Sequence, residues 1–355
     1  MLTQARVARL RLATQHLSHP LLTRPEQVVD ALGALQAQDY AAAKWGIGLR
    51  CVGVDDAAVE AAFNAGALIR THVLRPTWHF VRPRDLRWML ALTGPRIDAG
   101  NRGRYRDLGL DQPTHRRARR VLEKALRGRH LTRREIGTAL ERAGFDLSVP
   151  QRLGYILMRA ELESAICSGP RLGKQLTYAL VDERVPGTAA IARDEALTRL
   201  ARCYFATRGP ATLNDFAWWS GLTVADGRRA VGALGGEVER VDVDARPHWL
   251  IPSSAPRRAR HTAHLLPNYD EYFIGFRDRS AIGLRATAIP SMTALDRHIA
   301  IVDGQIVAGW SRAATSSTVH LAPVTTLSAS DRRHLAAAAA RYADFVGMAV
   351  EVEIR

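Results

Sequence analysis

Cysteines and long apolar runs are both scarce in this chain of 355 residues. The three cysteines stand far apart and form no CxxC pair: Cys51, Cys167 and Cys203. Such spacing argues against a thiolate metal site and is typical of a reducing compartment. No apolar run reaches the ~18–20 residues that a membrane-spanning helix needs, and the N-terminal residues lack the apolar core of a signal peptide. We therefore expect a cytoplasmic protein with no membrane partner.

Several catalytic signatures are also missing. The chain has no Walker A loop, no HExxH zinc signature and no GxSxG elbow. Its GxG, Gly46-Ile47-Gly48, lacks the rest of a dinucleotide fingerprint. His261 and His264 stand three positions apart without a third ligand nearby, so we expect two solvated or capping histidines. The sequence therefore predicts neither a metal nor a cofactor.

The net charge is strongly positive, at +15 with a pI near 10.7. Nearly all the cations are arginines, and the chain has three lysines: Lys44, Lys124 and Lys174. GC-rich coding explains arginine in place of lysine, but it does not explain the excess of cations over anions. Because the cations are spread along the chain, the natural partner is a large polyanion, and nucleic acid is the commonest one.

Three stretches of the sequence share one pattern, and the middle one is the clearest. Residues 114–129 place apolar side chains on one helical face and arginines on the other. Thr132 and Glu135 form a TxxE capping box at the start of a second helix, and 150–165 is a third amphipathic helix. Residues 166–181 read as two strands around a Gly-Pro bend. Three helices followed by a hairpin predict a winged helix.

The other two stretches repeat this pattern less clearly. The third stretch has three helices and then a hairpin around Asp244-Ala245, over residues 193–209, 212–222, 223–236 and 237–251. The first has two helices, a glycine-bearing loop, another helix and a hairpin turning at Arg75-Pro76, with the regular elements at 3–17, 25–37, 55–65 and 67–81.

The last hundred residues differ from the repeats. Asp303-Gly304 lies between two apolar strands and is a strong hairpin signal. A capped helix over 327–347 and an alternating strand over 348–354 follow. We therefore expect a helix-rich α+β fold: winged helices at 1–95, 96–190 and 191–255, then a C-terminal β-rich, barrel-like region at 256–355.

Three segments are crowded with polar side chains. The first is Gln36-Ala37-Gln38-Asp39, which could also be surface filler at a helix end. The second is the first hairpin, which could instead be a phosphate-gripping wing; its candidate site residues are His72, Arg75, Thr77 and His79. The third follows Pro267 and could instead pack at a domain interface; its candidates are Tyr269, Asp270, Tyr272, Arg277 and Arg279.

Five sequence segments together point to one family. They are LQAQD with the downstream KWG, THVLRPTWHFV, PATLNDFAWWSGL, LLPNYDEYFIGFRDR and VDGQIVAGWSR. In their order and spacing, which cover almost the whole chain, the sequence resembles the AlkZ-like bacterial DNA glycosylases. The resemblance implies three tandem winged helices in a C-shaped arrangement around a DNA-sized channel, with a small β-barrel-like region.

The resemblance also implies an activity and its residues. Members excise N-alkylated bases and can unhook interstrand crosslinks made by alkylating natural products. Their catalytic signature is Gln-x-Gln, which Gln36 and Gln38 match; a sister branch has Gln-x-Asp, whereas here Asp39 comes one position later. We therefore expect a glycosylase for DNA repair or self-resistance. Its partner would be double-stranded DNA carrying alkylated bases, and it would work as a nucleoid-associated monomer.

Two amides suffice for this chemistry if the leaving group is already charged. An N7-alkylguanine is cationic, so its departure needs no general acid, and the transition state resembles an oxocarbenium sugar. What remains is to position a water beside C1′ and to stabilise the developing charge. We expect Gln36 and Gln38 to hold that water by hydrogen bonds. In a helix, positions i and i+2 point about 200° apart, so the helix must end or distort at the motif.

Lysine scarcity bears on the reaction as well. A lyase step needs an amine that forms a Schiff base, and Lys44 is the only lysine near the motif. We therefore predict a monofunctional glycosylase that leaves an intact abasic site. Lys44 and Trp45 are candidates for contacts with DNA.

Two other functions fit the same sequence. A DNA-binding regulator without catalysis would use its winged helices as readers of sequence. A resistance protein would bind the alkylating agent directly and would not need DNA.

Overall fold

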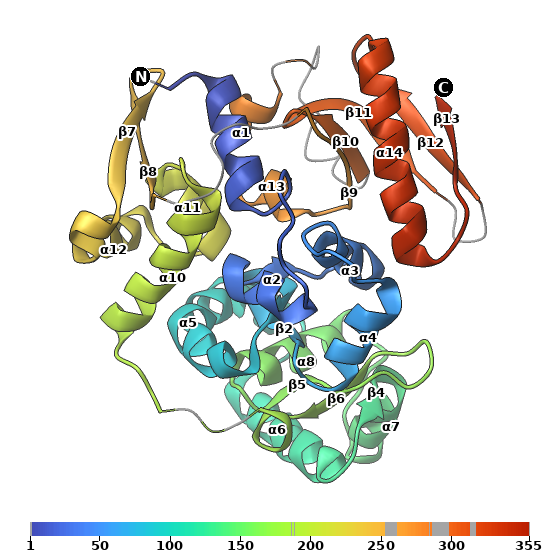
Figure 1. The fold of residues 1–355 in the computed structure, drawn as a ribbon. Coiled ribbons are helices and arrows are strands. Elements are labelled where there is room, and N and C mark those ends of the chain that lie inside the picture. Colours follow the sequence, from blue (N-terminus) through green and yellow to red (C-terminus); the bar gives the residue numbers. More distant parts are fainter. Residues whose placement is uncertain are drawn as a thin grey trace. The chain divides into compact units, whose positions relative to one another are not determined.

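The computed structural model contains two compact units, whose helices and strands are drawn in Figure 1. Unit 1 is built from three parts of the chain: Met1–Glu60, Thr198–Trp219 and Thr223–Arg355. Unit 2 contains the remaining residues: Ala61–Leu197 and Ser220–Leu222. The structure describes residues 2–185, 187, 189–252, 261–283, 285, 298–312 and 317–354. Both units mix helices with strands, which confirms the helix-rich α+β class, and none of the helices in these residues is long and apolar enough to cross a membrane.

The N-terminal part of the chain differs from the expected pattern around the Gln-x-Gln motif. α1 (Gln4–Thr14) and α4 (Asp56–Asn64) agree with the expected helices, but α2 spans only Pro25–Leu32. Gly33 follows α2 with a φ of +76°, and Leu35–Gln36 forms the short strand β1. A glycine that leaves the helical region ends the helix five residues before the expected boundary.

The stretch after the motif was expected to be a glycine-bearing loop, and this was wrong. It forms α3 (Tyr40–Gly48), because Asp39 caps the helix by accepting a hydrogen bond from the Ala42 N–H at 3.1 Å. The alanines that follow Tyr40 favour a helix once it is capped.

Residues 193–250 confirm the expected order of three helices and a hairpin. The elements are α10 (Arg193–Arg208), α11 (Leu213–Ser220), α12 (Val224–Leu234), the 3₁₀ turn η1 (Gly235–Glu237), β7 (Glu239–Val243) and β8 (Arg246–Leu250). Asp244 and Ala245 both have positive φ, as a two-residue hairpin turn requires.

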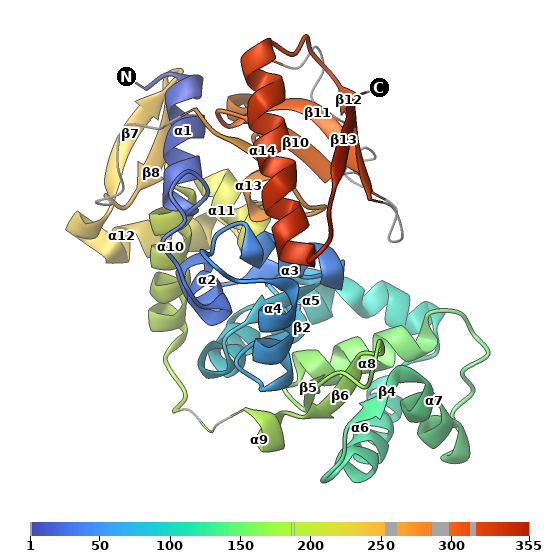
Figure 2. The ribbon, with the colours of Figure 1, turned by 45° about the vertical axis from the view of Figure 1, so that its right-hand side comes forward.

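The C-terminal part of unit 1 contains an open sheet of five strands in the order β13-β12-β11-β10-β9. The elements are β9 (Ala263–Leu266), α13 (Glu271–Ile274), η2 (Ser280–Ile282), β10 (His298–Val302), β11 (Gln305–Ser311), β12 (Thr318–Pro323), α14 (Ala329–Val346) and β13 (Glu351–Ile354). β12 and β13 are parallel, and the other neighbours are antiparallel. Asp303-Gly304 makes the predicted turn, and α14 packs against β9 and β10 (Figure 2).

Unit 2 begins with a hairpin and continues into a helical bundle with a small sheet. Its elements are β2 (Ile69–Val73), β3 (Arg75–Val81), α5 (Pro83–Asp107), α6 (Gln112–Leu126), β4 (Leu131–Thr132), α7 (Arg133–Arg142), α8 (Arg152–Leu162), β5 (Ile166–Ser168), β6 (Thr177–Leu180) and α9 (Val181–Arg184). The hairpin turns at Leu74, where φ is +64°, and not at Arg75-Pro76. α5 runs through Pro95 without a break, so the domain boundary expected after residue 95 falls inside a helix.

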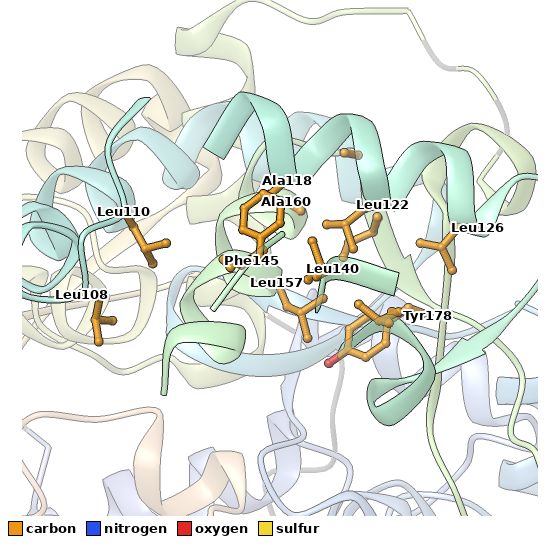
Figure 3. Close-up of a cluster of buried hydrophobic side chains, with 14 of the residues drawn as sticks. Leu108, Leu110, Ala118, Leu122, Leu126, Leu140, Phe145, Leu157, Ala160 and Tyr178 are labelled. Carbon is orange, nitrogen blue, oxygen red and sulfur yellow. The ribbon is translucent and has the colours of Figure 1, made fainter. Parts of the chain in front are cut away.

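The core of unit 2 is apolar and forms at the face that helical periodicity predicts. Ala118, Leu122 and Leu126 recur every four residues on one side of α6. Figure 3 shows them directed toward side chains of α7 and α8, with Tyr178 from β6 beside them. The Thr132–Glu135 capping box is present at the start of α7, as predicted.

His264 is inside unit 1, not solvated or capping as expected. It lies on β9, where every residue is buried, and its own side chain is fully buried. Burial lowers the pKa of His264 to about 3, and the cations Arg341 and Arg50 add to this shift. His261, in contrast, is exposed and pairs with Asp303 at 2.5 Å.

We predict that His264 makes the protein acid-sensitive. Its folded pKa of about 3 lies below the ordinary histidine value of 6.5, so below pH 6.5 the unfolded chain binds a proton that the folded chain excludes. The free energy of unfolding should therefore fall by about 2 kcal/mol between roughly pH 6.5 and pH 5 from this residue alone. Denaturant titrations of the parent and of His264→Phe measure it. Equal losses in the two proteins would contradict the prediction.

Candidate functional site

The Gln-Ala-Gln segment lies in unit 1, between the end of α2 and the start of α3. Gly33 allows the chain to leave α2, because its φ is left-handed and a Cβ there would lie 2.6 Å from Sγ of Cys203. The chain then runs extended through Leu35–Gln36. The motif is therefore outside any helix, and the angular separation that a helix would impose does not apply.

The two glutamines lie in different backbone environments. Gln36 ends the strand β1, whereas Gln38 lies in a bend before α3. Ala37 between them is fully buried, Gln36 is 7% exposed and Gln38 is exposed. Oε1 of Gln36 accepts no hydrogen bond from any residue in the described part of the chain. A buried amide oxygen of this kind is suited to accept a hydrogen bond from water or from a ligand.

His298 lies near Asp39 and was not selected from the sequence. Its Nδ1 accepts a hydrogen bond from the Asn268 N–H at 2.7 Å, so Nε2 carries the proton of the neutral ring. The ring stacks on Trp310 with centroids 4.5 Å apart. Burial lowers the pKa of His298, and the Asp39 carboxylate opposes this shift. No local pattern marks this histidine, because its neighbours come from distant parts of the chain.

Lys44 and Trp45 face the interior of unit 1, which differs from the expectation that they contact DNA. Nζ of Lys44 donates to Asp56 at 2.7 Å and to Glu60 at 2.8 Å, and the side chain is 6% exposed. Nε1 of Trp45 donates to the carbonyl of Leu265 at 2.7 Å. Both residues lie in the stretch of α3 from Ala42 to Ile47 that is buried throughout, and both polar groups are satisfied there.

Two thiols are also held unreactive. Burial raises the pKa of Cys51 to about 12, and it raises the pKa of Cys167 to about 12 as well. The thiolate is the nucleophilic form of cysteine. At neutral pH these side chains are therefore protonated.

The loop before α13 combines strain with a buried ion pair. Tyr269 has a φ of +61°, which is rare for a residue with a side chain and is common at functional sites. Asp270 is bound by both terminal nitrogens of Arg50, at 2.8 and 2.9 Å. Tyr272 is fully buried, and its hydroxyl donates to the carbonyls of Ala8 and Gly304. The structure thus places Asp270 and Tyr272 in packing roles and leaves Tyr269 half-buried.

Arg277 and Arg279 line a cleft of about 1050 Å³ in unit 1. The N–H groups of residues 277 and 278 both donate to the buried Asp215 carboxylate at 2.9 Å, which fixes this loop. Arg228, Arg246 and Trp249 lie on the same cleft. Asp278 offsets one of these charges by pairing with Arg246 at 2.7 Å. The remaining excess of arginine suits a polyanion.

The hairpin of unit 2 carries the second group of candidates. His72 is buried and hydrogen-bonded through Nδ1 to the carboxylate of Glu161. His79 is buried, and its Nδ1 donates to the carbonyl of Thr77 at 2.9 Å. Arg75 and Thr77 are half-buried. The four candidates therefore lie on one hairpin, and its two histidines are held in fixed orientations.

A second cleft, of about 770 Å³, lies within unit 2 beside this hairpin. Arg70 and Trp78 line it, with the guanidinium 4.4 Å from the ring centroid. Arg133 and Arg134 of α7 lie on the same cleft. Arginine stacked on an aromatic ring is a common element of surfaces that bind nucleic acid.

Glu271 is the other residue that sequence analysis missed. It is fully buried at the start of α13, and its Oε1 accepts a hydrogen bond from the Gln36 N–H at 2.9 Å. One sequence signal was available: Glu271 directly precedes the apolar run Tyr272-Phe273-Ile274, and a charged residue buried with such a run is rarely without a partner. The sequence could not show that its partner is the motif.

Residues 29–345 match the family model described as DNA glycosylase AlkZ-like. This chain belongs to the AlkZ-like family. The matched range contains the Gln-x-Gln segment, both clefts and the buried Glu271. The family consists of DNA glycosylases, which are hydrolases of N-glycosyl bonds.

Two relatives from Streptomyces sahachiroi are similar to this AlkZ-like chain over most of its length. A curated protein named interstrand DNA cross-link repair glycosylase is 25% identical over 319 residues, which cover 84% of this chain and 85% of that protein. The solved structure of DNA glycosylase AlkZ covers 100% of both chains, with a TM-score of 0.81 and 23% identity. At that identity the structural likeness establishes the fold.

We predict that Lys44→Met destabilises this AlkZ-like protein without weakening its hold on DNA. Asp56 and Glu60 would lose their common cation, which should lower the free energy of unfolding by about 1–3 kcal/mol. Denaturant titration and duplex-binding titration measure the two effects. Lys174→Met, at an exposed lysine, is the control and should change neither. A loss of DNA affinity with unchanged stability would instead place Lys44 against the phosphates.

Proposed function

We propose that this chain is a monofunctional DNA glycosylase that hydrolyses the N-glycosidic bond of cationic N-alkylated purines, of the N7-alkylguanine type. Its family membership supports a glycosylase. The observation that carries the substrate class is the absence of a strong acid in the motif. Gln36 offers a buried amide oxygen that accepts no hydrogen bond from the residues that the structure describes, and the adjacent acid, Asp39, caps α3.

The proposed mechanism follows from the charge of the lesion. A cationic base leaves as a neutral purine, so no proton has to be delivered to it. The sugar then carries the developing positive charge, as in glycoside hydrolysis. Oε1 of Gln36 accepts a hydrogen bond from the attacking water and, with the amide of Gln38, favours the cationic sugar. Neither residue has to change its protonation state during the reaction, because the proton that the attacking water loses passes to solvent.

The proposed substrate is double-stranded DNA, held by three winged helices in tandem. The order of helices and hairpin in residues 112–180 and 193–250 supports two of these repeats, and residues 4–81 supply the third in a more irregular form. The net charge of +15 supports a polyanionic partner. The C-shaped arrangement around a duplex is part of this proposal.

The proposed lesions include interstrand crosslinks. The S. sahachiroi relative is named for cross-link repair. A crosslink joined through N7 of guanine has the same cationic leaving group as a monoadduct, so the same two amides would serve for both. The biological role would be DNA repair or self-resistance to an alkylating natural product.

We predict that Gln36→Ala and Gln38→Ala each slow the release of N7-methylguanine by on the order of 100-fold. Affinity for the same duplex should change by less than about threefold, because the amides act on the transition state and not on the phosphates. Single-turnover assays with alkaline cleavage of abasic sites give the rate, and a binding titration gives the affinity.

Gln112→Ala, which removes an exposed glutamine at the start of α6, is the matched control and should retain the parental rate. Parental rates in both motif variants would disprove the catalytic assignment. A parent protein that protects a specific DNA sequence but releases no base would instead be a winged-helix regulator.

We also predict that borohydride traps no covalent adduct between the protein and its DNA product. A lyase would need a free amine for a Schiff base, and Lys44, the lysine nearest the motif, is held by two carboxylates. Gel electrophoresis after reduction makes the comparison, with a known bifunctional glycosylase as the positive control. A trapped adduct that disappears in Lys44→Met would show that the reaction includes a lyase step.

A further inference from the structure

Glu271 is a fully buried carboxylate that receives three hydrogen bonds. Its Oε1 accepts from the Gln36 N–H at 2.9 Å. Its Oε2 accepts from Nη2 of Arg208 at 2.6 Å and from Nε1 of Trp219 at 2.9 Å. Both oxygens are therefore occupied by donors from within unit 1, and the carboxylate is directed at the backbone of the motif.

Arg208, the partner of Glu271, holds the same segment by its carbonyls. It is the last residue of α10 and is fully buried. Its Nη1 donates to the carbonyl of Leu32 at 2.9 Å, and its Nη2 donates to the carbonyl of Ala34 at 3.3 Å. Its guanidinium lies 4.4 Å from the ring centroid of Trp219. The pair thus binds backbone groups of residues 32, 34 and 36, from the last residue of α2 to the last residue of β1.

A second buried ion pair in unit 1 also holds backbone groups but divides its carboxylate differently: Arg50 donates to the carbonyls of Gln15 and Gly46, and Asp270 accepts from the Tyr272 N–H. Arg50 and Asp270 bind each other through two parallel hydrogen bonds at 2.8 and 2.9 Å. In that pair the carboxylate uses both oxygens on its own arginine. Glu271 uses only one oxygen on Arg208 and gives the other to the Gln36 N–H. Burying two charges costs free energy that packing alone would not require.

We propose that Glu271, together with Arg208, is a positioning residue that fixes the peptide of Gln36 so that its side chain meets the attacking water. This inference rests on the proposed function. Glu271 acts through Gln36 and touches neither the water nor the DNA, because its side chain is fully buried inside unit 1. A displacement of a reacting group by about 1 Å can cost on the order of 100-fold in rate.

Glu271→Gln is the sharpest probe, because it preserves the shape of the side chain and replaces one acceptor oxygen by a donor NH₂ group. Three donors converge on two acceptor oxygens in the parent. A glutamine has one acceptor oxygen, and the charged Arg208 binds it most strongly. The glutamine NH₂ group then faces the Gln36 N–H, and two donors oppose each other at the motif.

The experiment measures the single-turnover release of N7-methylguanine from a duplex by the full chain. Glu271→Gln should lower the rate by about 10–100-fold while the affinity for the duplex stays within about twofold. The double variant Gln36→Ala/Glu271→Gln should be no slower than Gln36→Ala alone, because Glu271 works only through Gln36. A merely structural role would multiply the two losses.

Tyr272→Phe is the matched control on the same helix, α13. It removes two buried hydrogen bonds, to the carbonyls of Ala8 and Gly304. It should lower the Tm by about 2–4 °C and leave the rate within about twofold. Amide hydrogen exchange gives a readout that does not depend on activity: residues 33–39 should exchange faster in Glu271→Gln and not in Tyr272→Phe.

Arg208→Lys tests the same device if Glu271→Gln does not fold. It keeps the charge but loses the fork that reaches two carbonyls at once, so it should also slow base release and speed exchange at residues 33–39. Unchanged exchange and rates in the folded variant, or fully additive losses with Gln36→Ala, would overturn the inference. A parent protein that releases no base would overturn the proposed function, while the exchange result would still decide the role of Glu271.

Discussion

The ion pair between Glu271 and Arg208 is the constraint on which the site depends. It joins an arginine at the end of α10, a carboxylate at the start of α13 and the main chain that follows α2. Each of these elements has its own reason to end where it does: Gly33 after α2, Gly209 after α10 and Asp270 before α13. The backbone around Gln36 is therefore fixed where the ends of α2 and α10 and the start of α13 come together. No single stretch of sequence encodes it.

The chemistry of the motif is consistent with this kind of support. An acid or base is tuned by its pKa, whereas an amide has only its direction to offer. A residue without a titratable proton works only if its orientation is fixed before the substrate arrives. The need for a fixed orientation would then explain why two buried charges bind the backbone around Gln36. In the proposed mechanism, the fixed orientation of Gln36 takes the place of the pKa control that an acid–base pair would need.

Local signals in the sequence predicted much of the fold. The Thr132–Glu135 box, the Asp303-Gly304 turn and the apolar face of α6 each act over a few residues, and the structure has all three. The predictions failed where the local structure depends on residues far away in the sequence. Position 33 has to be glycine because a Cβ there would meet Cys203, and His264 is buried because α14 packs on β9, an edge strand of the sheet. Glu271 could be recognised as unusual, but its connection to Gln36 spans 235 positions.

The half-buried thiol of Cys51 and the buried thiol of Cys167 have a consequence for a protein proposed to act among alkylating compounds. Such compounds attack soft nucleophiles, and a thiolate reacts with them far faster than a thiol does. With pKa values near 12 for Cys51 and Cys167, very little thiolate is present at neutral pH. Lys44 is likewise covered by two carboxylates. Under the proposed function, these thiols and this amine would meet the same electrophiles that damage the DNA, and burial or ion pairing limits their reaction.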